Sequence, residues 1–191
     1  MAKNGKNGVY GIGEFAIADP AANGAYPTSF PFKFKAIVSG SLTFNDSAPS
    51  TNDVEIEDSE DPYAELPSSA ATKGFTVQTY DLSSETFKAI LGYTSTDNKW
   101  NNEQPTETEC YKAVQIKTKA FDDIPAKVFQ WSKMKLTVTR SGSISKTGLP
   151  NLNIVFRQMG VFDAEGNKVS GHRWAKLEDV KTEIDKETGD V

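Results

Sequence analysis

The stretch GFTVQTYDLSSETFKAILGYT, residues 74–94, changes its period in the middle, and this change decides the fold class. Over residues 75–82 successive side chains alternate between two faces, which is the two-residue repeat of a β-strand. After residue 83 the apolar side chains recur at the i, i+3, i+4 spacing of one face of an α-helix. These helical apolar positions are Phe87, Ile90 and Leu91. The pattern predicts a strand that runs directly into one short helix.

Both ends of this helix carry the expected signals. Ser83 is suited to cap the first turn through its hydroxyl, and Glu85 meets the positive end of the helix dipole. Gly92 can adopt the left-handed conformation that ends a helix. We therefore expect the helix to begin just after Ser83 and to end at Gly92.

Elsewhere the chain is dominated by patterns typical of strands. We expect strands at 35–44, 111–119, 134–140 and 151–162, a brief strand at 54–57, and a turn at 164–167 leading to a short partner at 168–169. Residues 9–18 read either as part of an extended arm or as one strand. A terminal helix is expected where Trp174, Leu177, Val180 and Ile184 follow helical spacing.

These elements predict a mainly β fold: a β-sandwich or barrel flanked by one short α-helix, with a long acidic loop at 45–72 and extended termini. The switch from strand to helix lets the helix cover an otherwise open face of the sheet. The residues expected to form the shared core are Phe75, Val77, Phe87, Ile90, Leu91, Val114, Ile116, Leu136, Val138, Ile154 and Phe156.

The bulk composition points to one folded domain. A chain of 191 residues with 37% hydrophobic residues can build one sizeable core. We expect an extended N-terminal arm at 1–30, the β-domain at 31–172, and an acidic tail at 173–191 that is partly helical. No stretch approaches the roughly 20 apolar residues of a membrane helix, and the start lacks the apolar run of a signal peptide. We therefore expect no membrane partner and synthesis in a cytoplasm.

The formal net charge of −5 is divided unevenly along the chain. Residues 53–65 hold seven acids and no base, and residues 174–191 hold six acids and three lysines. Together these segments carry −10, so the remainder carries +5. The body is basic and two appendages are acidic.

Recognisable catalytic and metal-binding chemistry is almost absent, and we expect neither an enzyme nor a cofactor. The single histidine, His172, has no G-x-S-x-G partner, and a free Cys110 at the start of a strand is more often a small core residue than a thiolate. GVYGIG does not match the dinucleotide fingerprint. The cluster at 55–65 lacks the spacing of a calcium loop, so a solvated acidic loop is the better reading. Outward lysines on two strands suit nucleic-acid contact or a plain solvated face, and no aromatic residues interleave with them.

The order of elements resembles the major tail, or tail tube, proteins of long-tailed bacteriophages. The resemblance runs over roughly residues 8–170 and includes NGVYGIGEFAIADP, AIVSGSLTF, KGFTVQTYDLSSETFKAILGY and NIVFRQMGVFDAEGNKV. Its most telling part is the strand that ends in DLSSE before a short helix closing at Ile90, Leu91 and Gly92. The acidic segment past His172 departs from the minimal pattern of the family.

This resemblance implies a structural virion protein that assembles as six-membered rings stacked into a tube. Phage DNA would pass through the lumen without specific binding, and type VI secretion tube proteins share the design. The implied partners are other copies of the chain and other tail proteins, and the implied location is the virion tail, assembled in the host cytoplasm. From a different class, a free β-sandwich module of a bacterium that binds carbohydrate or protein also fits, although Trp100, Trp131 and Trp174 look scattered in the sequence.

The division of charge leads to one hypothesis about contacts between subunits. Extended as a hairpin, the 28 residues of loop 45–72 would project up to ~45 Å and reach a neighbouring molecule. The candidate contact residues are the acids Glu55, Glu57, Asp58, Glu60 and Asp61, and the lysines Lys117, Lys119, Lys133 and Lys135. The alternative is that these acids face the lumen and keep DNA from adhering to its wall.

Overall fold

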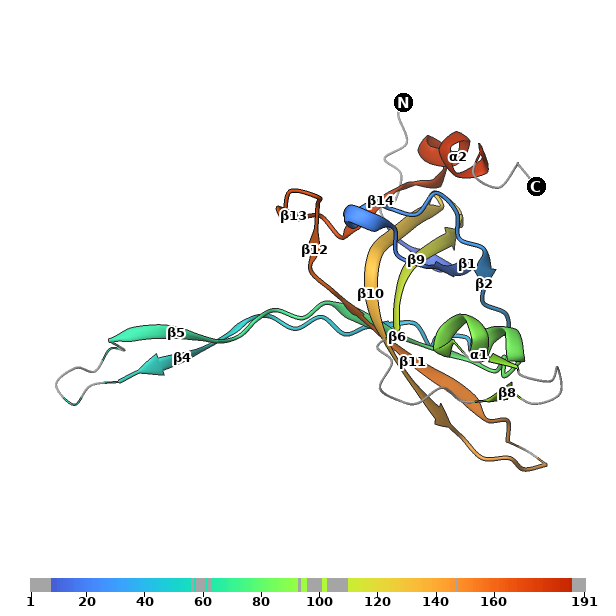
Figure 1. The fold of residues 1–191 in the computed structure, drawn as a ribbon, viewed down its shortest axis with the longest axis horizontal. Coiled ribbons are helices and arrows are strands. Elements are labelled where there is room, and N and C mark those ends of the chain that lie inside the picture. The colour runs from blue at the N-terminus through green and yellow to red at the C-terminus, as the bar shows by residue number, and fades with distance from the viewer. Residues whose placement is uncertain are drawn as a thin grey trace.

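The computed structural model describes residues 8–55, 57, 61, 63–92, 94–95, 101–102, 110–146 and 148–186. In this part of the chain the fold is mainly β, with one large antiparallel sheet and two short helices (Figure 1). In chain order its elements are β1 (Tyr10–Ala18), η1 (Ala22–Gly24), β2 (Phe32–Lys33), β3 (Thr43–Phe44), β4 (Ser50–Val54), β5 (Ala64–Ser69), β6 (Gly74–Thr79), α1 (Ser84–Leu91), β7 (Thr94–Ser95), β8 (Asn101–Asn102), β9 (Cys110–Lys119), β10 (Lys127–Ser141), β11 (Asn151–Gln158), β12 (Val161–Phe162), β13 (Lys168–Val169), β14 (His172–Lys176) and α2 (Leu177–Lys186).

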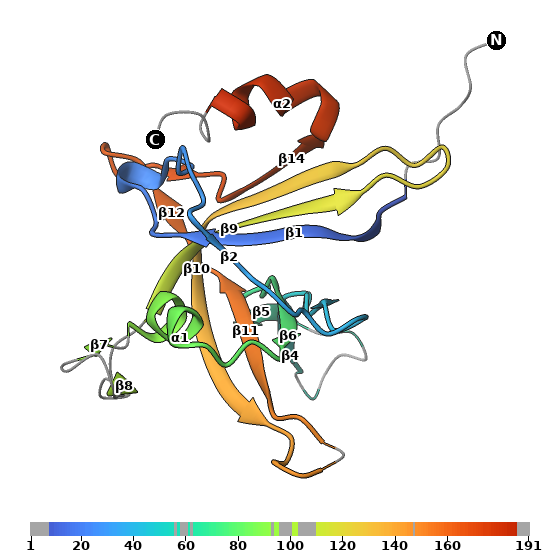
Figure 2. The ribbon, with the colours of Figure 1, turned by 90° about the vertical axis from the view of Figure 1, so that its right-hand side faces the viewer.

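The large sheet has eight strands in the order β2-β1-β9-β10-β11-β6-β3, with β14 paired with β10. Strand β10 is the hub of this sheet. Its first part pairs with β14 and its second part with β11, while β9 runs along the opposite edge of both parts. β10 therefore belongs to both halves of the fold, and Figure 2 shows it passing from the half that holds β14 to the half that holds β11.

A β-bulge makes this passage possible. Between Trp131 and Met134, β10 has one residue more than its partner β9, which bends the strand. The extra residue also changes which side chains face inward: Phe129 and Trp131 pack on the core before the bulge, and Met134 and Leu136 do so after it. The expected strand at 134–140 is confirmed but begins too late, because the alternation of residues 127–131 is out of phase with it.

The two halves face each other across one hydrophobic core. Phe15 of β1 packs edge-on against Phe75 of β6 and Phe156 of β11, with ring centroids 6.0 and 5.5 Å away. Phe75 also lies 5.0 Å from the ring of Trp131. β1 is thus an integral strand of the sheet, which decides between the two readings that the sequence left open for residues 9–18.

Residues 32–44 cross from one edge of the sheet to the other and close the barrel in part. β2 pairs with β1, Ile37 forms an isolated bridge with Thr79, and β3 pairs with β6. The expected continuous strand over 35–44 is wrong. Ala36 and Gly40 have positive φ angles of 49° and 73°, which interrupt an extended chain.

The switch from strand to helix at the centre of the sequence is confirmed. β6 ends at Thr79, and the Ser83 hydroxyl accepts a hydrogen bond from the Thr86 amide, which caps α1. Gly92 has a φ angle of 67° and ends the helix. All of the predicted core residues lie in one cluster: Phe87, Leu91 and Val138 are partly buried, and the others are buried.

The outer face of the β9–β10–β14 half is also covered. Gln115 is buried on this face and accepts a 2.7 Å hydrogen bond from the Gln130 side chain. Arg173 of β14 donates to Gln130, also at 2.7 Å. The terminal helix α2 is confirmed and lies beside this face, where Ile184 is buried. Trp174 belongs to β14 instead of the helix, because residues 172–176 pair with β10.

Two further expectations are settled by strand pairing. The turn after β12 is confirmed, since β12 and β13 pair across it. The expected strand at 151–162 is divided, because β11 ends at Gln158 and β12 begins at Val161.

No helix in the described part of the chain has the length and apolar character to cross a membrane.

Candidate functional site

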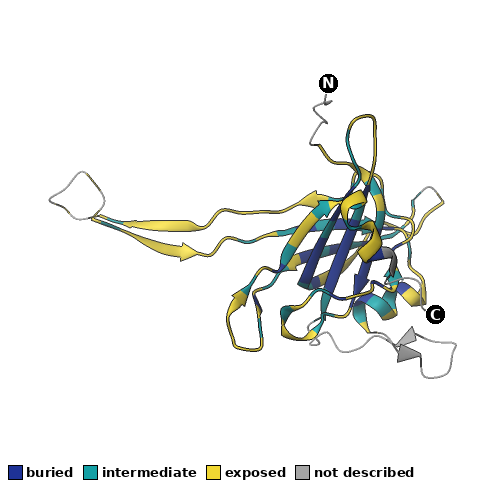
Figure 3. Cartoon of the chain, turned by 90° about the horizontal axis from the view of Figure 1, so that it is seen from above, coloured by how far each residue is buried: buried dark blue, intermediate teal, exposed yellow. Residues whose placement is uncertain are grey.

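The loop at 45–72 forms a long two-stranded arm that projects from the barrel (Figures 1 and 3). Strands β4 and β5 pair in antiparallel register, and a bridge between Ser47 and Thr72 continues the pairing toward the base. The brief strand expected at 54–57 is misplaced, since β4 ends at Val54. We call residues 45–72 the β4–β5 arm.

The arm has almost no packing of its own. In β4 and β5, Val54 and Ala64 are partly buried and every other residue is exposed. Figure 3 shows this exposure along the ribbon. A free two-stranded ribbon is at best marginally stable in water, because its backbone pairing is not supported by a buried side. The arm therefore has the properties of an element that gains stability from a partner.

The two faces of the arm differ in chemistry. Residues opposite each other share a face, so the pairing of Val54 with Ala64 and of Asn52 with Leu66 makes one face largely apolar. On the other face Asp53 lies opposite Glu65, and like charges in this position destabilise a ribbon. A positively charged partner would relieve this repulsion.

Three of the five predicted acids are described, and they lie at or near the outer end of the arm. Glu55, Glu57 and Asp61 are exposed. Asp58 and Glu60 lie outside the described residues. Tyr63, which the sequence did not single out, is 74% exposed beside this acidic end. Tyrosine is enriched at protein contact surfaces.

The predicted lysines do not form one cluster. Lys117 makes a 3.0 Å ion pair with Glu14 of β1, and Lys33 of β2 pairs with the same carboxylate at 2.7 Å. Burial alone would raise the pKa of Glu14, but the hydrogen bonds and charges of Lys33 and Lys117 outweigh it and hold the pKa below its ordinary value. Lys119 is exposed at the end of β9 and makes no ion pair within the described residues.

Lys133 and Lys135 lie toward the other end of β9. The ammonium of Lys133 lies 4.8 Å from the centroid of the Tyr111 ring, and Lys135 is the strand partner of Tyr111. Lys117 instead pairs with Val128, at the opposite end of the β9–β10 ladder. The sequence could identify these lysines as outward-facing, but only the register of the strands separates them into two sites.

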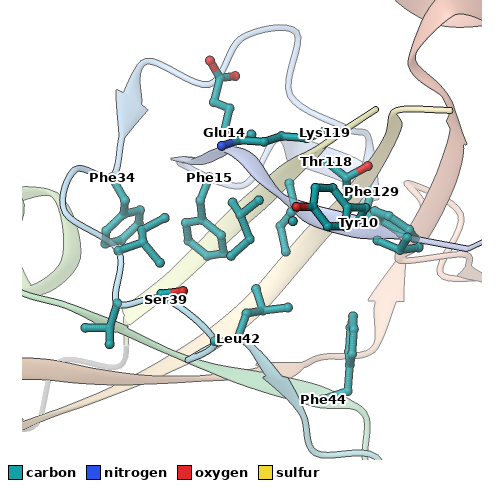
Figure 4. Close-up of a pocket in the computed structure, with 18 of the residues that line it drawn as sticks. Tyr10, Glu14, Phe15, Phe34, Ser39, Leu42, Phe44, Thr118, Lys119 and Phe129 are labelled. Atoms are coloured by element: carbon teal, nitrogen blue, oxygen red, sulfur yellow. The ribbon is translucent and has the colours of Figure 1, made fainter. Parts of the chain in front are cut away.

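An apolar groove opens at the side where β1 faces residues 37–44 (Figure 4). It encloses about 780 Å³. Its walls are formed chiefly by the side chains of Ile12, Phe15, Phe34, Leu42, Phe44 and Phe129. Figure 4 also labels Glu14, Ser39, Thr118, Lys119 and the phenol Tyr10 around it. We call this cavity the β1 groove; the sequence did not predict it, because its lining residues are far apart in the chain.

The aromatic residues of β10 and β14 form a row that sequence reasoning missed. The Trp131 and His172 rings stack at 4.7 Å between centroids, and those of Phe129 and Trp174 at 6.4 Å. Trp131 and Trp174, which looked scattered in the sequence, are thus brought together by the pairing of the two strands. Trp174 is 60% exposed, so the row ends at the surface.

His172 and Cys110 are both partly buried. Burial lowers the pKa of His172, the charge of Lys73 lowers it further, and Asp46 acts in the opposite direction. Burial raises the pKa of Cys110, whose Sγ lies 2.7 Å from the carbonyl oxygen of Ile90. The raised pKa keeps the Cys110 thiol protonated, and a thiol is a much weaker nucleophile than a thiolate.

Neither a metal cluster nor a known relative assigns a function to these residues. Within the described ranges, no three His, Cys, Asp or Glu side chains gather in a way that could hold a metal ion. Comparison of the sequence with protein-family models and with curated proteins found no match. The arm, the β1 groove and the aromatic row are therefore the features from which function is inferred.

Proposed function

We propose that this chain is the major tail, or tail tube, subunit of a bacteriophage. In this proposal it is a structural virion protein that polymerises as six-membered rings, stacked into the conduit for phage DNA. It is not an enzyme and uses no cofactor. Its partners are other copies of itself and other tail proteins, and DNA passes through the lumen without specific binding. It is assembled into the virion tail in the host cytoplasm.

The observation that carries this proposal is the β4–β5 arm. It is a long, acidic ribbon whose strands are almost entirely exposed, and it stands on a barrel that is otherwise well packed. An extension of this kind is favoured when a neighbouring molecule supplies the missing contacts. A tube also requires a heterologous, head-to-tail interface that can repeat. An arm and a separate surface that accepts the arm, both on the same subunit, would provide such an interface.

The acids of the arm admit two roles within the proposed tube. In the docking role they pair with basic side chains of a neighbouring subunit, where each exposed pair contributes only ~0.2–1 kcal/mol and several must act together. In the lumen role they repel the DNA backbone. Lys119, exposed and without an ion pair among the described residues, favours the docking role.

Electron microscopy of the purified protein tests the proposal directly. We expect rings or tubes, together with a mass by light scattering that rises with protein concentration. A strict monomer at high concentration, with no polymer in the micrographs, would contradict it.

A second candidate function is favoured by the aromatic row. Modules that bind carbohydrate stack sugars on exposed aromatic rings, and the row of Phe129, Trp131, His172 and Trp174 ends at the surface. In this reading the chain is a free β-sandwich binding module of a bacterium, for carbohydrate or protein.

Titration calorimetry with a panel of oligosaccharides distinguishes this candidate from the first. A carbohydrate module would remain a monomer and bind a sugar, and Trp174→Ala would remove that binding. Tyr80→Ala is the control, because Tyr80 is also exposed but lies at the end of β6, outside the row. No heat of binding with any oligosaccharide would argue against a carbohydrate module.

A further inference from the structure

The β1 groove is an opening in the wall of the barrel. β2 pairs only with Ala16 and Ile17, so the described strands give residues 10–14 of β1 a neighbour on the β9 side alone. Three large apolar residues around this opening remain exposed: Val9 at 56%, Tyr10 at 46% and Phe44 at 58%. An apolar patch next to an unpaired strand edge is typical of a site that another segment covers.

The edge of the groove is basic. Its polar lining includes Lys119; on the opposite face of β1, where Figure 4 shows the Glu14 carboxylate directed away from the cavity, Lys33 and Lys117 share that carboxylate. Together these four side chains carry a net positive charge, from three ammonium groups and one carboxylate. The preferred occupant is therefore an extended segment with an apolar side and a negative charge.

The β4–β5 arm has this chemistry. Val54, Ala64 and Leu66 share one face, and residues 53–65 hold seven acids and no base. Leu66 is 55% exposed and has no core of its own to enter. Figures 1 and 3 show the arm directed away from the barrel, which places its outer part out of reach of the groove in the same molecule.

We propose that the β1 groove of one subunit receives the apolar face of the β4–β5 arm of a second copy. Leu66 and Val54 enter the groove, and the acids of the arm lie near Lys33, Lys117 and Lys119. The arm then supplies the neighbour that the β1 edge lacks, which is strand addition with side-chain anchoring. The inference rests on the proposed self-assembly and names the surface that accepts the arm.

Cross-linking between two different variants tests this contact. Both carry Cys110→Ser, which removes the native thiol; one adds Ser39→Cys beside the groove, and the other adds Asn52→Cys opposite Leu66 on the arm. When the two are mixed and treated with a short thiol-reactive cross-linker, we expect a covalent dimer. A covalent dimer that contains one copy of each variant shows a contact between two subunits and not within one.

The control replaces Ser39→Cys with Ser141→Cys, an exposed position at the end of β10 away from the groove. This pair is expected to give no dimer above background. Polymers that form without a Ser39–Asn52 cross-link would overturn the groove contact and leave the tail tube proposal standing. Absence of any polymer in the parent protein would overturn both.

A substitution at the anchor gives an independent readout. Leu66→Asp should raise the protein concentration needed for assembly by about tenfold or more, as for loss of an interface anchor. Leu149→Asp is the matched control, because Leu149 is also exposed, at 71%, but lies between β10 and β11. Equal effects of the two substitutions would overturn the proposal.

Discussion

At the scale of single residues, Ile90 joins the helix to the barrel. It is fully buried in the main core, while Lys88 on the same helix is exposed. Ile90→Ala should therefore lower the free energy of unfolding by about 2–5 kcal/mol, because it leaves a cavity. Lys88→Ala should change it by no more than about 0.5 kcal/mol. Urea unfolding followed by circular dichroism measures both, and equal midpoints would show that α1 does not pack on the sheet.

His172 predicts how stability depends on pH. Burial holds its pKa below the ordinary value of 6.5, so the unfolded chain takes up a proton before the folded protein does as the pH falls. The contribution of His172 to stability is complete above about pH 6.5 and is lost as the pH drops toward the lowered pKa.

His172→Phe keeps a stacked ring but removes the titration. Unfolding midpoints measured between about pH 7.5 and 5.5 should fall more steeply for the parent than for this variant, because carboxylates titrate mostly below that range. Parallel profiles for the two proteins would mean that His172 protonates equally in the folded and unfolded states.

At the scale of elements, the β4–β5 arm is expected to be independent of the barrel. Ser47 and Thr72 form a bridged pair at its base, so residues 48–71 can be replaced by Asn-Gly, the usual two-residue hairpin turn. The melting temperature should stay unchanged, because the strands of the arm contribute no residue to the core clusters. Assembly should be lost. A lower melting temperature in calorimetry would show that the arm supports the fold.

At the scale of the whole molecule, the separation of charge predicts assembly that depends on salt. Replacing Glu55, Glu57, Asp58, Glu60 and Asp61 with Gln and Asn should weaken assembly if these acids dock on a neighbour. For the parent, raising salt from about 0.1 to 1 M shortens the Debye length from about 10 to 3 Å and should weaken assembly as well. Sedimentation of polymers measures both effects.

The control for this prediction neutralises Glu178, Asp179 and Glu183, which are exposed acids of α2 at a distance from the arm in Figure 1. Their replacement should leave assembly unchanged. If the arm variant polymerises like the parent at low and high salt, the acids do not dock, and the lumen role is favoured.

The sequence by itself determined the elements whose signals are local. The change of period at Ser83, its capping hydroxyl and the left-handed Gly92 are local signals, so both ends of α1 were predicted. The start of β6 was also predicted to within one residue, but the strand ends at Thr79 and not at residue 82. The alternation of β9 also named its inward residues, Val114 and Ile116. Burial of one face imposes such a pattern wherever a strand or helix is regular.

Only the tertiary structure decided the features that depend on pairing between distant segments. The bulge in β10 changes which side chains face the core partway along the strand. The alternation of its second part therefore did not predict the inward residues of its first part. Strand register decides three of these features: the separation of Lys117 from Lys133, the row formed by Trp131 and Trp174, and the β1 groove. Strand register depends on which residues of distant segments pack together in the core, and a single sequence does not identify these residue pairs.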